Sequence, residues 1–165
     1  MPYAPKNNPT PPLYLVGIDP DINKSGLVRV NTVERRLDTH TCLTEAEVEA
    51  FALTMTPGEV WFVVEDGSLN GGMWHGKNTS NWNPNAAKQY GASIAKHVGA
   101  NHYAGHRLIA LLTGHGYTVN LYRPNSKKWN HAWFLRILQA KRITHNVRRT
   151  NPEVRDAMRC LIKYF

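Results

Sequence analysis

The chain has 165 residues, which suits one domain with a single hydrophobic core, and 42% of them are hydrophobic, a fraction that argues against wholesale disorder. No apolar run approaches the length of a membrane span, and the two cysteines, Cys42 and Cys160, are too few for a zinc site. The net charge of +8 favours a polyanionic partner. Because no secretory signal is visible, we expect reduced cysteines and a cytoplasmic setting.

The first predicted elements are a β-hairpin and a weaker third strand. Residues 13–18 form a short apolar run that ends in Asp-Pro, as a buried strand stopped by a turn does. Residues 23–26 are rich in turn formers, and residues 27–31 return as a second strand. Residues 36–42 give a weaker signal for a third strand next to this hairpin.

A helix and a buried strand are predicted next. Thr44 and Glu47 have the spacing of a capping box, in which each side chain satisfies a free backbone amide of the other residue. The helix is expected to extend to about Met55, where a Pro-Gly pair ends it. Residues 60–64 are strongly β-prone and end in Glu-Asp, which predicts a buried strand.

The middle of the chain predicts a long loop and then a long helical region. Residues 66–83 are polar and contain many Gly and Asn residues, a composition and length typical of functional loops. Asn-Pro then caps a helical region over residues 84–114, which we expect to be broken near residues 99–105. Small residues recur on one face of this region, at Ala87, Gly91, Ala95 and Gly99.

A strand and two helices complete the predicted order. The strand covers residues 117–122 and the first helix residues 127–138. The second helix covers residues 152–165 and has apolar residues at helical spacing throughout. The fold class is therefore α/β with a mixed central β-sheet flanked by helices. Residues 1–12, rich in Pro and Asn, are expected to be a flexible N-terminal tail ahead of a single domain at residues 13–165.

The charge is unevenly distributed along the chain. From Gly67 to Pro152 there is no Asp or Glu, whereas this stretch holds twelve Lys and Arg residues and seven of the eight His residues. Such a surface attracts polyanions and releases their counterions on binding. We therefore predict nucleic acid as the partner. A membrane surface is a poorer match, because the cations are not confined to one amphipathic helix.

Two acidic residues follow the predicted central strands. Asp19 comes directly after the first strand, and Glu65 directly after the strand at residues 60–64. Acids at strand ends of open α/β sheets face the crevice where ligands bind. Asp19 alone fits a turn residue equally well, whereas Glu65 is a poor turn former and is the stronger candidate.

Two further acids lie on the final helix. Glu153 and Asp156 are three residues apart, so they project to the same side. Glu153 also suits the first turn of a helix, whereas Asp156 lies deeper, among arginines. Four converging acids require cations, and Mg²⁺, with Mn²⁺ as an alternative, is the usual choice beside phosphates. Two such ions per active site would support phosphodiester cleavage.

The ordered set of motifs resembles the RuvC Holliday-junction resolvases. Residues 15–20 with Ser25-Gly26 resemble the opening strand and turn of that family, and residues 63–65 its second acidic strand. Residues 122–128 resemble the Tyr-x-Pro-x-x-Val-Lys segment of that family. Residues 153–157 resemble its closing acidic helix. The order and coarse spacing match from Leu13 onward.

This resemblance implies an RNase H-like fold, a homodimer and a Mg²⁺-dependent endonuclease that makes paired nicks in branched DNA. It implies that Asp19, Glu65, Glu153 and Asp156 are both the catalytic residues and the metal ligands. The chain departs from the family where Asp21 replaces a small residue and Lys127 replaces Val. It is identified as a divergent member, bacterial or from a phage acting in the host cytoplasm.

Cationic and aromatic side chains from three segments are candidate DNA contacts. They are Trp74, Lys77, Trp82, Lys127, Lys128, Arg148 and Arg149. The tryptophans lie in the long loop, where exposed rings stack on unpaired bases, although packing of the loop onto the domain explains them equally well. Histidines recur at positions 97, 102, 106 and 115 without one helical spacing, which favours surface or phosphate-facing roles over a metal cluster.

Two other functions remain open at this stage. An RNase H-fold nuclease that acts on flaps or RNA would use the same acids. A non-catalytic nucleic-acid-binding module would keep the basic surface, but buried acids without metal would only destabilise it. An actin-like ATPase would require a second domain that 165 residues do not provide.

Overall fold

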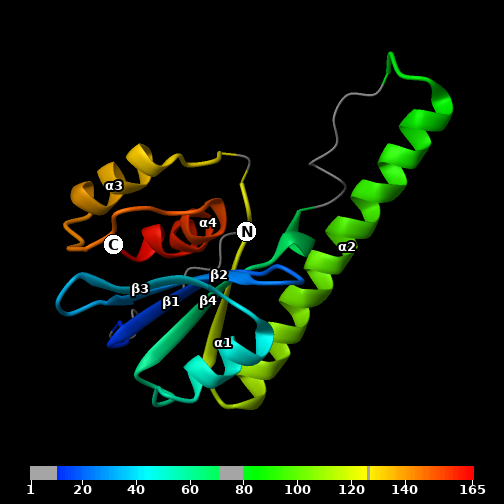
Figure 1. Cartoon of the computed structure of the whole chain (residues 1–165). Coiled ribbons are helices and arrows are strands. Elements are labelled where there is room, and N and C mark those ends of the chain that lie inside the picture. The colour runs from blue at the N-terminus through cyan, green and yellow to red at the C-terminus, as the bar shows by residue number, and fades with distance from the viewer. Residues whose placement is uncertain (1–10, 71–79, 126) are drawn as a thin grey trace.

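The computed structural model of the protein describes residues 11–70, 80–125 and 127–165. Within these residues the strands form a five-stranded mixed sheet in the order β3-β2-β1-β4-β5 (Figure 1). The strands are β1 (Tyr14–Asp19), β2 (Ser25–Asn31), β3 (Arg36–Leu43), β4 (Val60–Glu65) and β5 (Thr118–Tyr122). β2 runs antiparallel to β1 and β3, whereas β1, β4 and β5 run parallel. The C-terminal ends of these three parallel strands therefore meet at one end of the sheet.

Helices cover both faces of the sheet, as Figure 1 shows. They are α1 (Glu45–Ala52), α2 (Pro84–Gly114), α3 (His131–Ala140) and α4 (Pro152–Leu161), with short 3-10 helices η1 (Gly67–Leu69) and η2 (Ile162–Tyr164). The central strands alternate their side chains between two cores. Leu15 and Val63 pack with α3 and α4, whereas Val16 and Val64 pack with α1 and α2. None of the described helices is both long enough and apolar enough to cross a membrane.

Two glycines let α4 approach the sheet closely. A Cβ atom on Gly17 would lie 2.2 Å from the carbonyl oxygen of Ala157, and one on Gly26 would lie 2.2 Å from that of Glu153. Any side chain there would push the helix away from β1 and β2. Gly17 of the Gly-Ile-Asp motif and Gly26 of the Ser-Gly motif therefore set the distance between α4 and β1, the strand that carries Asp19.

The predicted order of elements is confirmed, including the third strand and the capping box at Thr44 and Glu47. The predicted break in the long helix is wrong, because α2 continues as one 31-residue helix. Gly105 is buried inside this helix near Pro20 and the backbone of Glu65, where a Cβ would make ordinary van der Waals contacts at 3.5 and 3.7 Å. α3 begins at His131 and not at Lys127, because the Asn130 side chain caps it. The last helix ends at Leu161, where η2 follows.

Candidate active site

The two strand-end acids lie side by side at the carboxyl end of the sheet. β1 and β4 are adjacent and parallel, and Ile18 is paired with Val64, so Asp19 and Glu65 follow at equivalent positions. Strand alternation directs both side chains to the α4 face, because Leu15 and Val63 already point that way. The following turn is closed by Asp21, which accepts the Asn23 amide at 2.9 Å. Asp19 is therefore not needed as a turn residue.

Helix α4 brings its two acids to the same end. Asn151 caps the helix through the Val154 amide, and Pro152 begins it. Asp156 is 3% exposed, one turn into the helix, and Glu153 is half-buried near Gly26. The structure therefore gathers all four acids named from the sequence.

Burial and mutual repulsion shift the titration of this cluster. Burial, and then the charges of Glu65 and Asp156, raise the pKa of Asp19 to about 8. Burial raises the pKa of Glu65 to about 7, although Arg159 opposes the shift. The Oε2 atom of Glu65 is buried and has no hydrogen-bond partner. The Glu65 carboxyl is therefore poorly satisfied by the rest of the protein.

Asp156 is instead held by two cations. Arg159 donates from Nη1 to Oδ1 at 2.7 Å, and it is itself fixed by the carbonyl of Asn125 at 2.8 Å. Lys128 pairs with Oδ2, although its side chain is 63% exposed. With Asp156 engaged in this way, no three Asp, Glu, His or Cys side chains among the described residues stand close enough to ligate one ion.

The donor set nevertheless fits a hard divalent cation. Carboxylate oxygens are the ligands that Mg²⁺ and Mn²⁺ prefer. The unpartnered Glu65 oxygen and the raised pKa values of Asp19 and Glu65 indicate missing positive charge at this place. The exposed ammonium of Lys128 supplies part of that charge to Asp156 in the metal-free protein. Asp19, Glu65, Glu153 and Asp156 are therefore the residues that would hold the metal.

A cleft of about 120 Å³ opens beside the acids. Its lining includes Asp19 and Glu65 together with Asn101 and His102 from α2. The bare Cα of Gly67 makes room for the imidazole, since a Cβ there would lie 2.6 Å from His102 Nε2. The place of His102 in the site is not predictable from the sequence, because it depends on the unbroken path of α2.

The remaining candidate residues lie in different places. Trp74 and Lys77 fall outside the described residues. Trp82 is exposed near the start of α2, with its ring 5.2 Å from that of Tyr90. Lys127, Arg148 and Arg149 are exposed. Two of the histidines pair with groups other than the four site acids, His106 with Ser68 and Asp66, and His115 with Glu49.

The sheet order, the helices on both faces and the acids at the strand ends define an RNase H-like α/β fold. Thermus thermophilus RuvC, solved in complex with a Holliday junction substrate, matches with a TM-score of 0.53 at 16% identity, covering 91% of this chain and 90% of that one. A second T. thermophilus RuvC structure matches with a TM-score of 0.47 at 12% identity, covering 92% of this chain and 96% of that one. No family model matches the chain, and no curated protein does either. The first likeness confirms the RuvC-type fold predicted from the sequence.

Proposed function

We propose that the protein is a Mg²⁺-dependent endodeoxyribonuclease that cuts branched DNA such as Holliday junctions. The observation that carries the proposal is the gathering of Asp19, Glu65, Glu153 and Asp156 beside an open cleft, with Glu65 Oε2 buried and unpartnered. A RuvC-type fold supports the choice of nuclease, and the T. thermophilus RuvC matched here was solved with a Holliday junction. The test is cleavage of end-labelled junctions with and without Mg²⁺.

Each residue of the site has a distinct part in this proposal. When bound, a pair of Mg²⁺ ions supplies water activation and stabilisation of the leaving oxygen in phosphodiester hydrolysis. Asp19 and Glu65 would provide ligand oxygens from the sheet, and Glu153 and Asp156, the latter held in place by Arg159, would provide them from α4. Lys128 has a side chain that is 63% exposed and an ammonium that pairs with Asp156, so its charge lies beside the acids, where a phosphate would bind. His102 lines the opposite wall, within reach of a bound substrate.

A binding module without chemistry is less well supported by the same site. Burying carboxyls without partners lowers the stability of a protein, and a pure binding surface gains nothing from it. The acids also place negative charge where a DNA phosphate would otherwise bind. Retention of the cluster is explained by cation binding, which offsets both costs.

DNA binding should depend strongly on salt. All twelve Asp and Glu residues lie outside the stretch from Gly67 to Pro152, so this surface meets phosphates with little internal neutralisation. If it makes six to ten phosphate contacts, affinity should fall by about 10³–10⁵-fold between 50 and 200 mM salt. Fluorescence anisotropy in EDTA measures this without cleavage. A flat titration would contradict the basic face as the DNA-binding surface.

The protein is further proposed to act as a two-fold homodimer, because a four-way junction requires two related nicks. The small-residue stripe on α2 is the candidate interface. The alternative, packing of the stripe on the sheet, is wrong: among the described residues, a Cβ on Gly91 or Gly99 would meet no atom within 4 Å. Figure 1 shows this half of α2 extending beyond the sheet, which leaves the stripe available to a second copy.

Gly91→Leu should therefore give folded monomers that no longer make paired nicks. The side chain meets open space within one protomer, and loss of a mid-helix glycine should raise its melting temperature slightly. Ala92→Leu, exposed on the same turn but off the stripe, is the matched control and should stay dimeric. Light scattering of both variants measures whether each is a monomer or a dimer. A wild type that is monomeric both free and on junction DNA would refute the dimer.

A further inference from the structure

The connection between α3 and α4 is the most cationic exposed segment away from the carboxylate site. We call residues 141–149 the basic connection. Its cationic or protonatable side chains are Lys141, Arg142, His145, Arg148 and Arg149, and it contains no acid. Every Asp and Glu of the chain lies within the described residues, and none of them forms an ion pair with these five. The charge of this segment is therefore not neutralised within the protein.

The backbone of the basic connection is held firmly. Ile143 and Val147 are buried in the core beneath α3 and α4. Thr144 accepts the Leu37 amide at 2.9 Å and donates its own amide to Arg35 at 2.8 Å, which ties the segment to the start of β3. The cations that flank these anchors consequently project from a fixed surface and not from a loose loop.

Arg142 occupies a position that suits glycine. The amide of Arg142 bonds to Gln139 at 2.9 Å and that of Ile143 to Leu138 at 2.8 Å, which is a Schellman C-cap. The residue at this position adopts the left-handed region, and Arg142 has φ 55°. Glycine is the favoured residue there, because a Cβ is strained in that conformation. An arginine held at this position against local preference indicates a use for its side chain.

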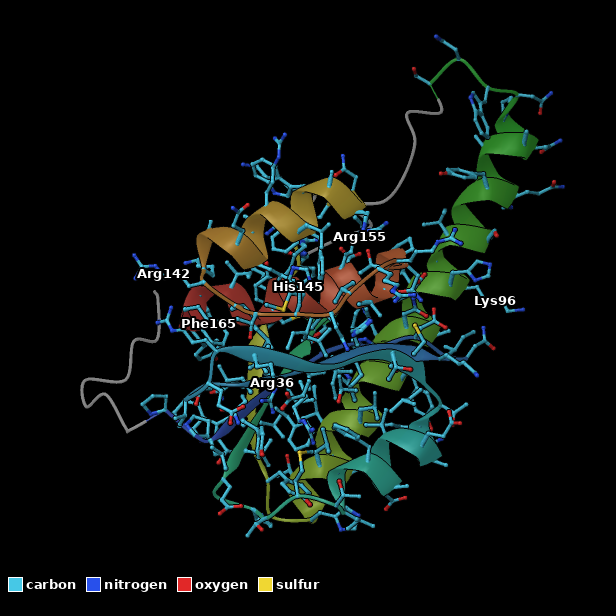
Figure 2. All side chains as sticks on the ribbon, turned by 60° about the vertical axis from the view of Figure 1, so that its left-hand side comes forward. Arg36, Lys96, Arg142, His145, Arg155 and Phe165 are labelled. Carbon is cyan, nitrogen blue, oxygen red and sulfur yellow. The ribbon has the colours of Figure 1, made fainter. Side chains whose placement is uncertain are left out.

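The basic connection runs along the edge of the sheet toward the acids. Its start pairs with the start of β3, where Arg36 bridges Thr144. Beyond its end, Asn151 contacts Cys42 at 3.0 Å, and Cys42 is paired with Gly26, the partner of Asp19. The six residue steps from Arg36 to Cys42 span roughly 20 Å. Figure 2 shows Arg142 and His145 following one another toward Arg155 on α4.

We propose that the basic connection binds the phosphate backbone of a duplex DNA arm that leads away from the carboxylate cleft. This proposal rests on the nuclease function proposed above and specifies where its substrate lies. A length of roughly 20 Å corresponds to about six base pairs. His145 takes part as a donor in the tautomer whose Nδ1 accepts the Val147 amide at 3.2 Å, because the proton then lies on Nε2 and the residue is exposed.

Arg142→Gly tests the proposal by separating stability from binding. Substrates with arms of about 4, 8 and 12 base pairs are titrated in EDTA, so that the result does not depend on cleavage. The wild type should bind more tightly as the arm lengthens to about eight base pairs and then level off. The variant should melt at the same temperature or about 2 °C higher, because strain is relieved. It should lose part of the arm-length gain, and its salt slope should fall by about 1.

Two further proteins complete the experiment. Arg148→Gln combined with Arg149→Gln keeps the backbone unstrained and should reduce the salt slope by about 2 on long arms. Arg136→Gln removes one positive charge, as Arg142→Gly does, but from the exposed face of α3, and it should leave the arm-length dependence intact. Variants that bind long arms as tightly as the wild type, or that lose affinity equally at every arm length, would overturn the proposal. Arm-length dependence without cleavage would instead reject the nuclease function and leave this surface standing.

Discussion

Asp19→Asn is expected to abolish cleavage while leaving DNA binding intact. Asp19 lies at the end of β1 beside Glu65 and lines the cleft, so it is placed to hold a metal ion next to a substrate in the cleft. Loss of an outer-shell partner of a metal ligand alone costs about 10–100-fold, and loss of a ligand oxygen should cost more than about 100-fold. The basic surface that holds DNA is unchanged. Single-turnover cleavage and anisotropy in parallel measure both quantities.

The same substitution should stabilise the metal-free protein at alkaline pH. The Asp19 carboxyl has its pKa raised to about 8 because ionisation is penalised by burial and by neighbouring acids, and asparagine has no charge to penalise. Asp21→Asn is the matched control, because Asp21 lies two residues away, and asparagine keeps an acceptor for the Asn23 amide. An Asp19→Asn protein that cut junctions at nearly the wild-type rate would remove Asp19 from the site.

The stability of the metal-free protein should fall as the pH rises from about 4 to about 8. The pKa of Asp19 is raised from 3.8 to about 8, and that of Glu65 from 4.5 to about 7. The folded state therefore keeps protons that the unfolded state has released, so stability decreases with pH across this window. It is lowest above pH 8, where both carboxyls must be ionised in the folded protein.

Mg²⁺ should reverse this loss, and most strongly at high pH. Metal binding requires ionised carboxylates, so protons compete with the ion at pH values below the raised pKa values of about 8 for Asp19 and about 7 for Glu65. At a concentration 100-fold above its Kd, an ion adds about 2.7 kcal/mol, which raises the melting temperature by about 5–10 °C in a protein of this size. Melting curves at pH 5.5 and 8.5, with EDTA or Mg²⁺, measure the difference. The double variant Asp19→Asn, Glu65→Gln should lose both the pH slope and the Mg²⁺ response.

An equal Mg²⁺ response at both pH values would contradict this account, as would a response that persists in the double variant. The first outcome would place the ion on groups that do not titrate in this window. The second would place it elsewhere on the protein. Either result would separate the raised pKa values from metal binding.

The strand ends of this protein were predictable because hydrophobicity marks them. Residues 15–18 and 62–64 are apolar, and each run stops at an acid, so adjacent parallel strands bring Asp19 and Glu65 together. Glu153 and Asp156 were predictable because helical spacing places both on one side of a final, capped helix. These inferences needed only local patterns and the rule that parallel strands end at the same edge.

Other features depended on tertiary contacts that no local pattern reveals. α2 continues through Gly105, which is buried near Pro20, although a glycine in a helix usually suggests a break. The place of His102 in the cleft follows from that unbroken helix and from the missing side chain of Gly67. The pairing of Lys128 with Asp156 joins segments 28 residues apart, and a phosphate contact was the expectation from sequence.

The central claim is metal-dependent cleavage of branched DNA by the carboxylate cluster. The most direct measurement incubates end-labelled four-way junction, duplex, flap and RNA substrates with the protein, with Mg²⁺ or EDTA, and with Asp19→Asn beside the wild type. The account predicts symmetric nicks in the junction only for the wild type in Mg²⁺, with far less cutting of duplex. Cutting in EDTA, equal cutting by Asp19→Asn, or no cutting of any substrate in Mg²⁺ would contradict it.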